Sequence, residues 1–228
     1  MIAESAKIYS RNIGDNVEIR DYSIIYEPVI VEHDVVIGEH SVLGRSATPT
    51  SVMKKELSMR KETRISSGTS VCSNVIIYED VMIGNESLIG DNSSIMTNVR
   101  IGQKVLISRG VTINTEVEIG DHTRIMDNSH ITGRVKIGSH VFISVGVTMA
   151  NDNLFGKHGY DEKVSGATIG DYVSIGVGAV LLPGVKIGRG SIIAAGSVVN
   201  KDVPENVIYS GSPTQTLIRV PRHMRRYD

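Results

Sequence analysis

The chain of 228 residues has no tryptophan, two phenylalanines and one cysteine. With Cys72 alone no internal disulfide can form, which is typical of a reducing compartment, so the sequence predicts a cytoplasmic protein in which Cys72 is structural. The net charge is −1 with no basic stripe, and this argues against nucleic acid as a partner. No apolar run is long enough to span a membrane, and no apolar leader follows Met1, so we expect no membrane partner.

The chain is instead rich in aliphatic residues at a fixed interval. Every sixth position is aliphatic, most often Ile, for fifteen consecutive sites from Ile65 to Met149. The same interval runs from Ile13 to Leu43 and from Ile169 to Val199. A short period carried over most of a chain indicates a repeat architecture, and six-residue repeats build parallel β-helices.

The period also explains the composition. Three six-residue sides close a coil of 18 residues, and the inward aliphatic side chains of successive coils stack in a bore too narrow for an indole. Gly and Asn or Asp are expected at the corners, where a positive φ is needed. The 27 repeats predict an all-β fold of about nine triangular coils, roughly 43 Å tall. We assign residues 1–205 to this β-helix and residues 206–228 to a C-terminal capping tail.

Two insertions interrupt the period, and insertions in a repeat protein often carry its function. The first, residues 45–64, is mostly basic, and its segment 53–61 has the composition of one or two helical turns. It is either a solvated flap or a clamp on an anionic ligand such as a nucleotide diphosphate. The second, residues 150–163, combines polar groups with glycines and aromatics. We expect an active-site loop here, with a plain surface loop as the alternative.

The repeats of the form Ile-Gly-x-x-Val/Ser-x, the protruding loop and the segment 193–204 resemble the left-handed β-helix acyltransferases over about residues 10–220. The resemblance implies a left-handed coil, a homotrimer, and acyl-CoA bound in the groove between neighbouring columns. We expect acetyl-CoA as the co-substrate because acetyl transfer dominates this family.

Within that superfamily, segment 126–130 followed by Asn151 and Asp152 resembles enzymes that N-acetylate amino sugars on nucleotide carriers. The resemblance implies that Asn128 contacts the sugar amine and that Asn151 and Asp152 belong to the substrate loop. Sugar O-acetyltransferases resemble this chain too, but they carry a histidine where Asn151 stands, and the histidine of this loop is His158. We count three more residues as candidate substrate contacts, which are Asp127, Asn153 and His158.

The resemblance also implies contacts to CoA. They fall on Val177, Gly178, Ala195, Asn200 and Lys201. The end motif of many members, Gly-x-Pro-x-Lys/Arg, lacks its cation in the segment 211–215, and Arg219 is our candidate replacement. A backbone N–H near Gly146 is a candidate oxyanion donor, because glycine lets a thioester approach closely.

Three side chains are candidates for the chemistry itself. Asn128 is either a substrate ligand or one member of a corner ladder with Asn74 and Asn92, each a multiple of 18 residues away. His130 is either the base or a polar surface residue. Asp152 either holds the amine and accepts its proton or caps the loop.

One further pattern suggests a metal. His122 and His140 are 18 residues apart and therefore stack, as in metal-binding β-helices of the carbonic anhydrase type. The His-x-x-x-x-His pair of those proteins is absent, so we expect stacked surface histidines and no metal. Glu116 and Arg134, also 18 apart, predict an ion pair across coils.

The sequence thus predicts an acetyl-CoA-dependent N-acetyltransferase acting on the amine of a nucleotide-linked deoxyamino sugar. The alternatives are an O-acetyltransferase of a sugar or small acceptor, and a non-catalytic or metal-binding β-helix.

Overall fold

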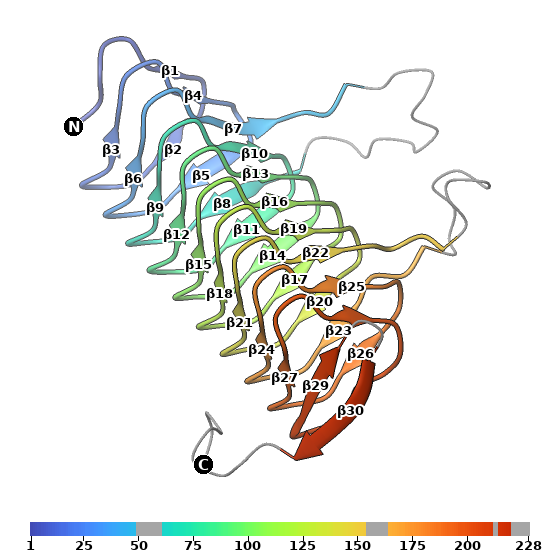
Figure 1. Ribbon diagram of the computed structural model, residues 1–228. Helices are drawn as coiled ribbons and strands as arrows, with labels where there is room; N and C mark the ends of the chain where they lie inside the picture. The colour runs from blue at the N-terminus through green and yellow to red at the C-terminus, as the bar shows by residue number, and fades with distance from the viewer. Residues whose placement is uncertain (49–60, 154–163, 212–213, 220–228) are drawn as a thin grey trace.

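The computed structural model describes residues 1–48, 61–153, 164–211 and 214–219 (Figure 1). All regular secondary structure in these ranges is β-strand, arranged in three sheets of ten, nine and eleven strands. Neighbours within a sheet are parallel strands from successive coils, apart from one antiparallel pair at the C-terminal end. The predicted left-handed parallel β-helix is confirmed.

Each coil passes through the three sheets in turn. The ten-stranded sheet contains β1 (Lys7–Ile8), β4 (Ile24–Ile25), β7 (Val42–Arg45), β10 (Ile76–Tyr78), β13 (Ser94–Ile95), β16 (Thr112–Ile113), β19 (His130–Ile131), β22 (Thr148–Met149), β25 (Val180–Leu181) and β28 (Val198–Val199). The nine-stranded sheet contains β2 (Asn12–Ile13), β5 (Val29–Val31), β8 (Thr63–Ile65), β11 (Val81–Ile83), β14 (Val99–Ile101), β17 (Glu118–Ile119), β20 (Lys136–Ile137), β23 (Thr168–Ile169) and β26 (Lys186–Ile187).

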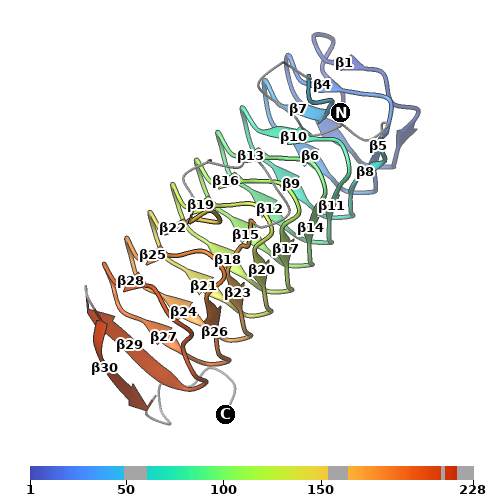
Figure 2. The same ribbon diagram turned by 90° about the vertical axis from the view of Figure 1, so that its right-hand side faces the viewer.

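The eleven-stranded sheet contains β3 (Glu18–Ile19), β6 (Val36–Ile37), β9 (Ser70–Val71), β12 (Leu88–Ile89), β15 (Leu106–Ile107), β18 (Arg124–Ile125), β21 (Phe142–Ile143), β24 (Ser174–Ile175), β27 (Ile192–Ile193), β29 (Val207–Gly211) and β30 (Thr214–Arg219). The nine predicted coils are all present. The additional strands β1 and β29 lengthen the column to about ten turns, which Figure 2 shows from the side.

The core is a stack of identical side chains. Ile107 pairs with Ile125 and Ile125 with Ile143, and all three are fully buried. The valines of the intervening repeat position, such as Val111 and Val147, are buried in the same way. Stacking one aliphatic size from coil to coil fills the bore at the density of a protein interior.

Three edges join the sheets, and we name each by its character. The glycine edge joins the eleven-stranded to the ten-stranded sheet, the excursion edge joins the ten-stranded to the nine-stranded sheet, and the aromatic edge joins the nine-stranded to the eleven-stranded sheet. The corners of the glycine edge are residues 21–22, 39–40, 73–74, 91–92, 109–110, 127–128, 145–146, 177–178 and 195–196. Many corners of all three edges hold a residue at positive φ, as predicted, for example Asn92, Asn128 and Gly146.

The glycines that follow isoleucine have a different role from the one we expected. Gly120 and Gly138 are not among the residues at positive φ. A Cβ on Gly120 would lie 2.6 Å from the backbone carbon of Gly138, in the next coil. These glycines are therefore required by the close approach of successive coils.

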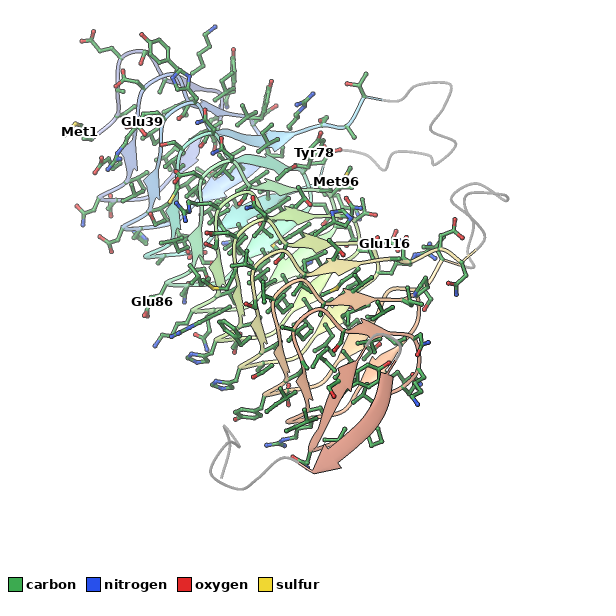
Figure 3. All side chains as sticks on the ribbon, viewed as in Figure 1. Met1, Glu39, Tyr78, Glu86, Met96 and Glu116 are labelled. Carbon is green, nitrogen blue, oxygen red and sulfur yellow. The ribbon has the colours of Figure 1, made fainter. Side chains whose placement is uncertain are left out.

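Both insertions leave the solenoid at the excursion edge (Figure 1). The base of the first is held by Ser46, whose hydroxyl donates to Glu79 at 3.0 Å, and by Lys61, 3.1 Å from Asp80. Figure 3 shows Tyr78, Met96 and Glu116 on this side of the prism, opposite Glu86. The helical turns expected within 53–61 fall almost wholly on residues outside the described ranges, and residues 61–65 there are loop and strand.

The predicted capping tail begins with a hairpin. β29 continues the eleven-stranded sheet and β30 pairs with it antiparallel. Tyr209 of β29 is fully buried, and its hydroxyl donates to the carbonyl of Val198 at 3.0 Å. An aromatic side chain thus lies in the core at the last turn, where an exposed coil would otherwise end. In the described ranges no helix is long and apolar enough to cross a membrane.

Candidate active site along the glycine edge

The glycine edge changes character along its length. Its N-terminal corners carry acidic and polar side chains such as Asp21, Glu39 and Asp91. Its C-terminal corners carry pairs of a small or apolar residue and glycine, which are Val145–Gly146, Val177–Gly178 and Ala195–Gly196. The change occurs at the corner Asp127–Asn128.

The C-terminal half of this edge is open backbone. Gly146, Gly178 and Gly196 have φ of 66°, 66° and 67°, and a Cβ on any of them would meet nothing within 4 Å. Beside them Val145 and Val177 are 40% and 51% exposed, although most valines of the chain are buried. A ligand can therefore lie directly against the main chain here, with apolar side chains beside it.

Asp127 is committed to neighbouring groups. Its carboxylate accepts hydrogen bonds from the side chains of Arg109, at 2.8 Å, and Ser108, and from the Arg109 backbone N–H at 3.1 Å. The Arg109 guanidinium and then the Ser108 hydroxyl lower the pKa of Asp127 to about 2. Asp127 is therefore a fixed anion at neutral pH and a poor proton acceptor.

Asn128 follows at φ 58° and is exposed. Its Oδ1 lies 2.6 Å from the position that a Cβ on Gly110 would occupy, so the side chain leans towards the preceding coil. The corner ladder that is the alternative role of Asn128 is real, since Asn74, Asn92 and Asn128 are all at positive φ. Asn128 nevertheless lies directly before Gly146, where the open backbone begins.

His130 lies two residues beyond Asn128, on β19 of the ten-stranded sheet. Its Nδ1 is 2.6 Å from Oγ1 of Thr112, the residue that pairs with it on β16. Burial lowers the pKa of His130 below the ordinary value of 6.5. At neutral pH the imidazole is therefore mainly uncharged, the form in which it can accept a proton.

The start of the second insertion lies on a different edge. Asn151, Asp152 and Asn153 follow β22 at the excursion edge, where Asn153 is exposed. The amide of Asn151 donates to the carbonyl of Gly133 at 3.3 Å, and its own carbonyl accepts from Ser165 N at 3.0 Å. Asn151 thus ties the two ends of the insertion together. His158 lies outside the described residues.

The predicted ion pair of Glu116 and Arg134 reinforces this base. Arg134 Nε is 2.9 Å from Glu116, as the 18-residue spacing predicted. The same guanidinium donates through Nη1 to the carbonyl of Val164, at the far end of the insertion. The pair is therefore also part of the support of the insertion.

The remaining candidate CoA contacts lie at the C-terminal end. Asn200 follows β28, and its Oδ1 accepts from the buried Tyr209 hydroxyl at 3.3 Å. Lys201 is exposed at the excursion edge, and Arg219 ends β30. Hence Asn200 and Lys201 are separated from Val177, Gly178 and Ala195 by the ten-stranded sheet.

The structure thus divides the predicted site into two groups. Asp127, Asn128 and Gly146 lie together on the glycine edge, with His130 just inside the adjoining sheet. Asn151, Asp152 and Asn153 lie on the excursion edge, in the next coil. The five residues from Asn128 to Gly133 cross the sheet, which corresponds to roughly 16 Å at the rise of an extended strand.

Sequence reasoning missed three contributors to the glycine edge. Val145 and Gly196 continue the open track, and Thr112 contacts His130. The 18-residue spacing that linked Asn92 to Asn128 also links Thr112 to His130. That spacing identified Thr112 as a neighbour, but it did not reveal the hydrogen bond.

The histidine pair suggested as a metal site forms a ring stack instead. The rings of His122 and His140 are 4.7 Å apart and nearly parallel, and Tyr172 stacks on His140 at 4.8 Å. Within the described residues, no group of three or more His, Cys, Asp or Glu side chains could hold a metal ion. Cys72 is half-buried, and burial raises the pKa of its thiol, which makes it a weak nucleophile.

Family models match the repeats of this chain. A model described as bacterial transferase hexapeptide (six repeats) matches residues 12–45, 116–151 and 166–201. A second, described as hexapeptide repeat of succinyl-transferase, matches residues 80–115, and the two together cover more than half of the chain. The chain belongs to the hexapeptide-repeat transferases.

Curated relatives include transferases to nitrogen and to oxygen. The 2,3,4,5-tetrahydropyridine-2,6-dicarboxylate N-acetyltransferase of Clostridium perfringens is 55% identical over 49 residues, 22% of this chain and 21% of the relative. The galactoside O-acetyltransferase of Lactococcus lactis is 48% identical over 54 residues, 24% of this chain and 25% of the relative. The chain therefore spans about a quarter of the length of these relatives.

A solved structure with the same fold covers nearly the whole hexapeptide-repeat chain. A UDP-N-acetylglucosamine acyltransferase superposes with a TM-score of 0.64 at 23% identity, over 98% of this chain and 75% of that one. At this identity the likeness establishes the fold alone.

Proposed function

We propose that this hexapeptide-repeat protein is a cytoplasmic, acetyl-CoA-dependent N-acetyltransferase acting on the amine of a nucleotide-linked deoxyamino sugar. The observation that carries the proposal is the open track of Gly146, Gly178 and Gly196, which leads to Asn128. Membership of the transferase family and the acetyltransferases among its relatives support the same reaction.

The glycine edge fits an acetyl-CoA molecule in two respects. The arm of CoA alternates amides with short carbon chains, and it can contact both a bare backbone and the exposed Val145 and Val177. A side chain at the glycine positions would occupy this space. We assign Gly146, Val177, Gly178 and Ala195 to the arm of CoA and keep Asn200, Lys201 and Arg219 as candidates for its distal part.

Acetyl transfer to an amine needs alignment and one proton acceptor. The amine nitrogen attacks the thioester carbon, the carbon–sulfur bond breaks, and CoA leaves as the thiolate or thiol. Uncharged His130 is positioned to take the proton that the amine loses, because it lies two residues from Asn128. We assign Asn128 to orienting the amine, while Asp127 is held as an anion by Arg109.

The acceptor reaches beyond the glycine edge. Asp152, with Asn151 and Asn153, lies roughly 16 Å away across the ten-stranded sheet of the same protomer. One protomer therefore cannot bring Asn128 and Asp152 to the same amine. We propose a homotrimer in which the excursion edge of a neighbouring copy completes the site and contacts the nucleotide sugar, with His158 as a further candidate contact.

A hydroxyl acceptor is the second candidate. It is favoured by the contact of Thr112 with His130, because a hydroxyl needs a positioned base more than an amine does. Transfer to oxygen would then use the same glycine edge and the same imidazole.

Thiol release from acetyl-CoA by the full-length protein separates these possibilities. The acceptors are 3-amino and 4-amino deoxysugar nucleotides, each matched with the nucleotide sugar that carries a hydroxyl at that carbon. We expect turnover with an amino sugar and none with its hydroxyl partner. Turnover with hydroxyl acceptors alone would establish O-acetylation, and no turnover together with no acetyl-CoA binding would overturn the transferase proposal.

A further inference from the structure

We propose that Thr112 is a positioning residue that holds the imidazole of His130 in the Nδ1–H tautomer, so that Nε2 is the atom that takes the proton. This inference rests on the proposed acetyl transfer and adds a second residue to its base. Nothing in the sequence motifs singled out Thr112.

The register of the ten-stranded sheet creates the contact. Thr112 of β16 and His130 of β19 are directly paired in adjacent coils, and both side chains point outward from the same strand position. Thr112 Oγ1 lies 2.6 Å from Nδ1, within hydrogen-bond distance. Threonine is branched at Cβ and has restricted χ1 rotation in a strand, so its hydroxyl is a fixed partner.

The direction of this hydrogen bond decides the chemistry. If Thr112 donates to Nδ1, Nε2 carries the hydrogen and cannot accept another proton. If Nδ1–H donates to Oγ1, Nε2 keeps its lone pair for the substrate. The second arrangement also survives proton transfer, because the imidazolium still donates from Nδ1 to the same oxygen without any rotation of the hydroxyl.

The surroundings of His130 leave this contact as its main polar constraint. The strands on its two sides present Thr112 and Thr148, neither of which titrates near neutral pH. The nearest charged group along its own chain is Asp127, whose carboxylate is paired with Arg109. Burial alone shifts the pKa of His130, and it shifts it downward. Among the described residues no carboxylate takes the orienting role that we assign to Thr112.

Thr148 provides a matched control. It pairs with His130 from the opposite side, in β22, and is exposed like Thr112. Thr112→Val and Thr148→Val both replace a hydroxyl by a methyl on an exposed strand position, where valine is favoured. A loss seen with the first and absent in the second therefore reports the hydrogen bond to Nδ1.

The first measurement is the ¹⁵N NMR spectrum of the His130 ring in the full-length protein without substrate. We expect the Nδ1–H tautomer in the wild type and in Thr112→Ser, and a shift towards Nε2–H in Thr112→Val. Thr148→Val should give the wild-type spectrum. A wild type with hydrogen on Nε2, or a Thr112→Val spectrum equal to the wild type, would overturn the inference.

The second measurement is kcat against pH with acetyl-CoA and the acceptor identified above. Losing one net hydrogen bond of the usual strength corresponds to about a tenfold lower kcat for Thr112→Val, with KM for acetyl-CoA unchanged. Thr112→Ser should restore the rate, and His130→Gln should cost about 10²- to 10⁴-fold. A His130→Gln enzyme as fast as the wild type would refute the base and the positioning role together.

Failure of the proposed function has a separate signature. If no acceptor is acetylated, the proposed function fails while the NMR spectra still decide whether Thr112 sets the tautomer. If acceptors are acetylated and Thr112→Val keeps both its rate and its spectrum, only the inference fails.

Discussion

Replacing Gly178 by alanine tests the assignment of the glycine edge to acetyl-CoA. A Cβ at Gly178 meets nothing within the protomer, so the cost to folding comes only from an L residue at φ 66°. That cost is about 1–2 kcal/mol, or a fall in Tm of about 2–8 °C for a chain of this size. The methyl does, however, project into the space that we assign to the arm of CoA.

Gly68 is the matched control, because it lies on the aromatic edge at φ 69° and its Cβ would make only an ordinary contact of 3.5 Å with Glu86. Both variants should lose similar stability. A methyl forced into a close contact costs about 1–3 kcal/mol, so Gly178→Ala should weaken acetyl-CoA binding about 5- to 150-fold. Titration calorimetry gives the Kd, and equal values for Gly178→Ala, Gly68→Ala and the wild type would refute the assignment.

Three further predictions concern the solenoid and its charges. Gly120→Ala places a Cβ 2.6 Å from the Gly138 backbone and should lower the free energy of unfolding by about 1–3 kcal/mol in urea; an unchanged midpoint would contradict the close-approach role. Asp127 should titrate near pH 2 by NMR, since Arg109 and Ser108 lower its pKa, and Arg109→Ala should move the midpoint up towards 3.8. Because the folded pKa lies below the ordinary one, the stabilisation by Asp127 is complete above about pH 4 and is lost as the pH falls through 2. Tyr209→Phe removes the hydrogen bond to Val198 and should cost about 0.5–1.5 kcal/mol in thermal unfolding, with Kd for acetyl-CoA unchanged; a larger cost would mean that the ring itself is displaced.

Most of the fold could be predicted because one physical rule repeats along the chain. Each inward Ile needs another above and below it, so the spacing of six residues determines coil number and the three faces together. The same rule predicted the ion pair of Glu116 with Arg134 and the stacking of His122 on His140, both confirmed. Side chains one coil apart face one another, and this follows from sequence distance alone.

The purpose of the glycines after isoleucine could not be predicted in the same way. Glycine suggests positive φ, but at Gly120 the requirement comes from the backbone of the next coil. A repeat identifies which residues are neighbours and leaves their separation open. The contact of Thr112 with Nδ1 of His130 belongs to the same class, because it depends on rotamers.

The candidate site was predicted in its parts, while their separation was not. The residue types drew Asn128 and Asp152 into one constellation. Counting one six-residue side from Asn128 to Arg134 would have placed them on opposite edges of the ten-stranded sheet, as the structure does. Several other candidates, including Asn200, make contacts within the fold that no motif reveals.

The central claim is that acetyl-CoA lies along the glycine edge, and hydrogen exchange of the full-length protein with and without acetyl-CoA tests it most directly. The account predicts added protection in peptides covering residues 144–148, 176–180 and 194–198, and none in peptides confined to the aromatic edge around residues 121–122 and 139–140. Protection on the aromatic edge, with the glycine edge unchanged at saturating acetyl-CoA, would contradict it.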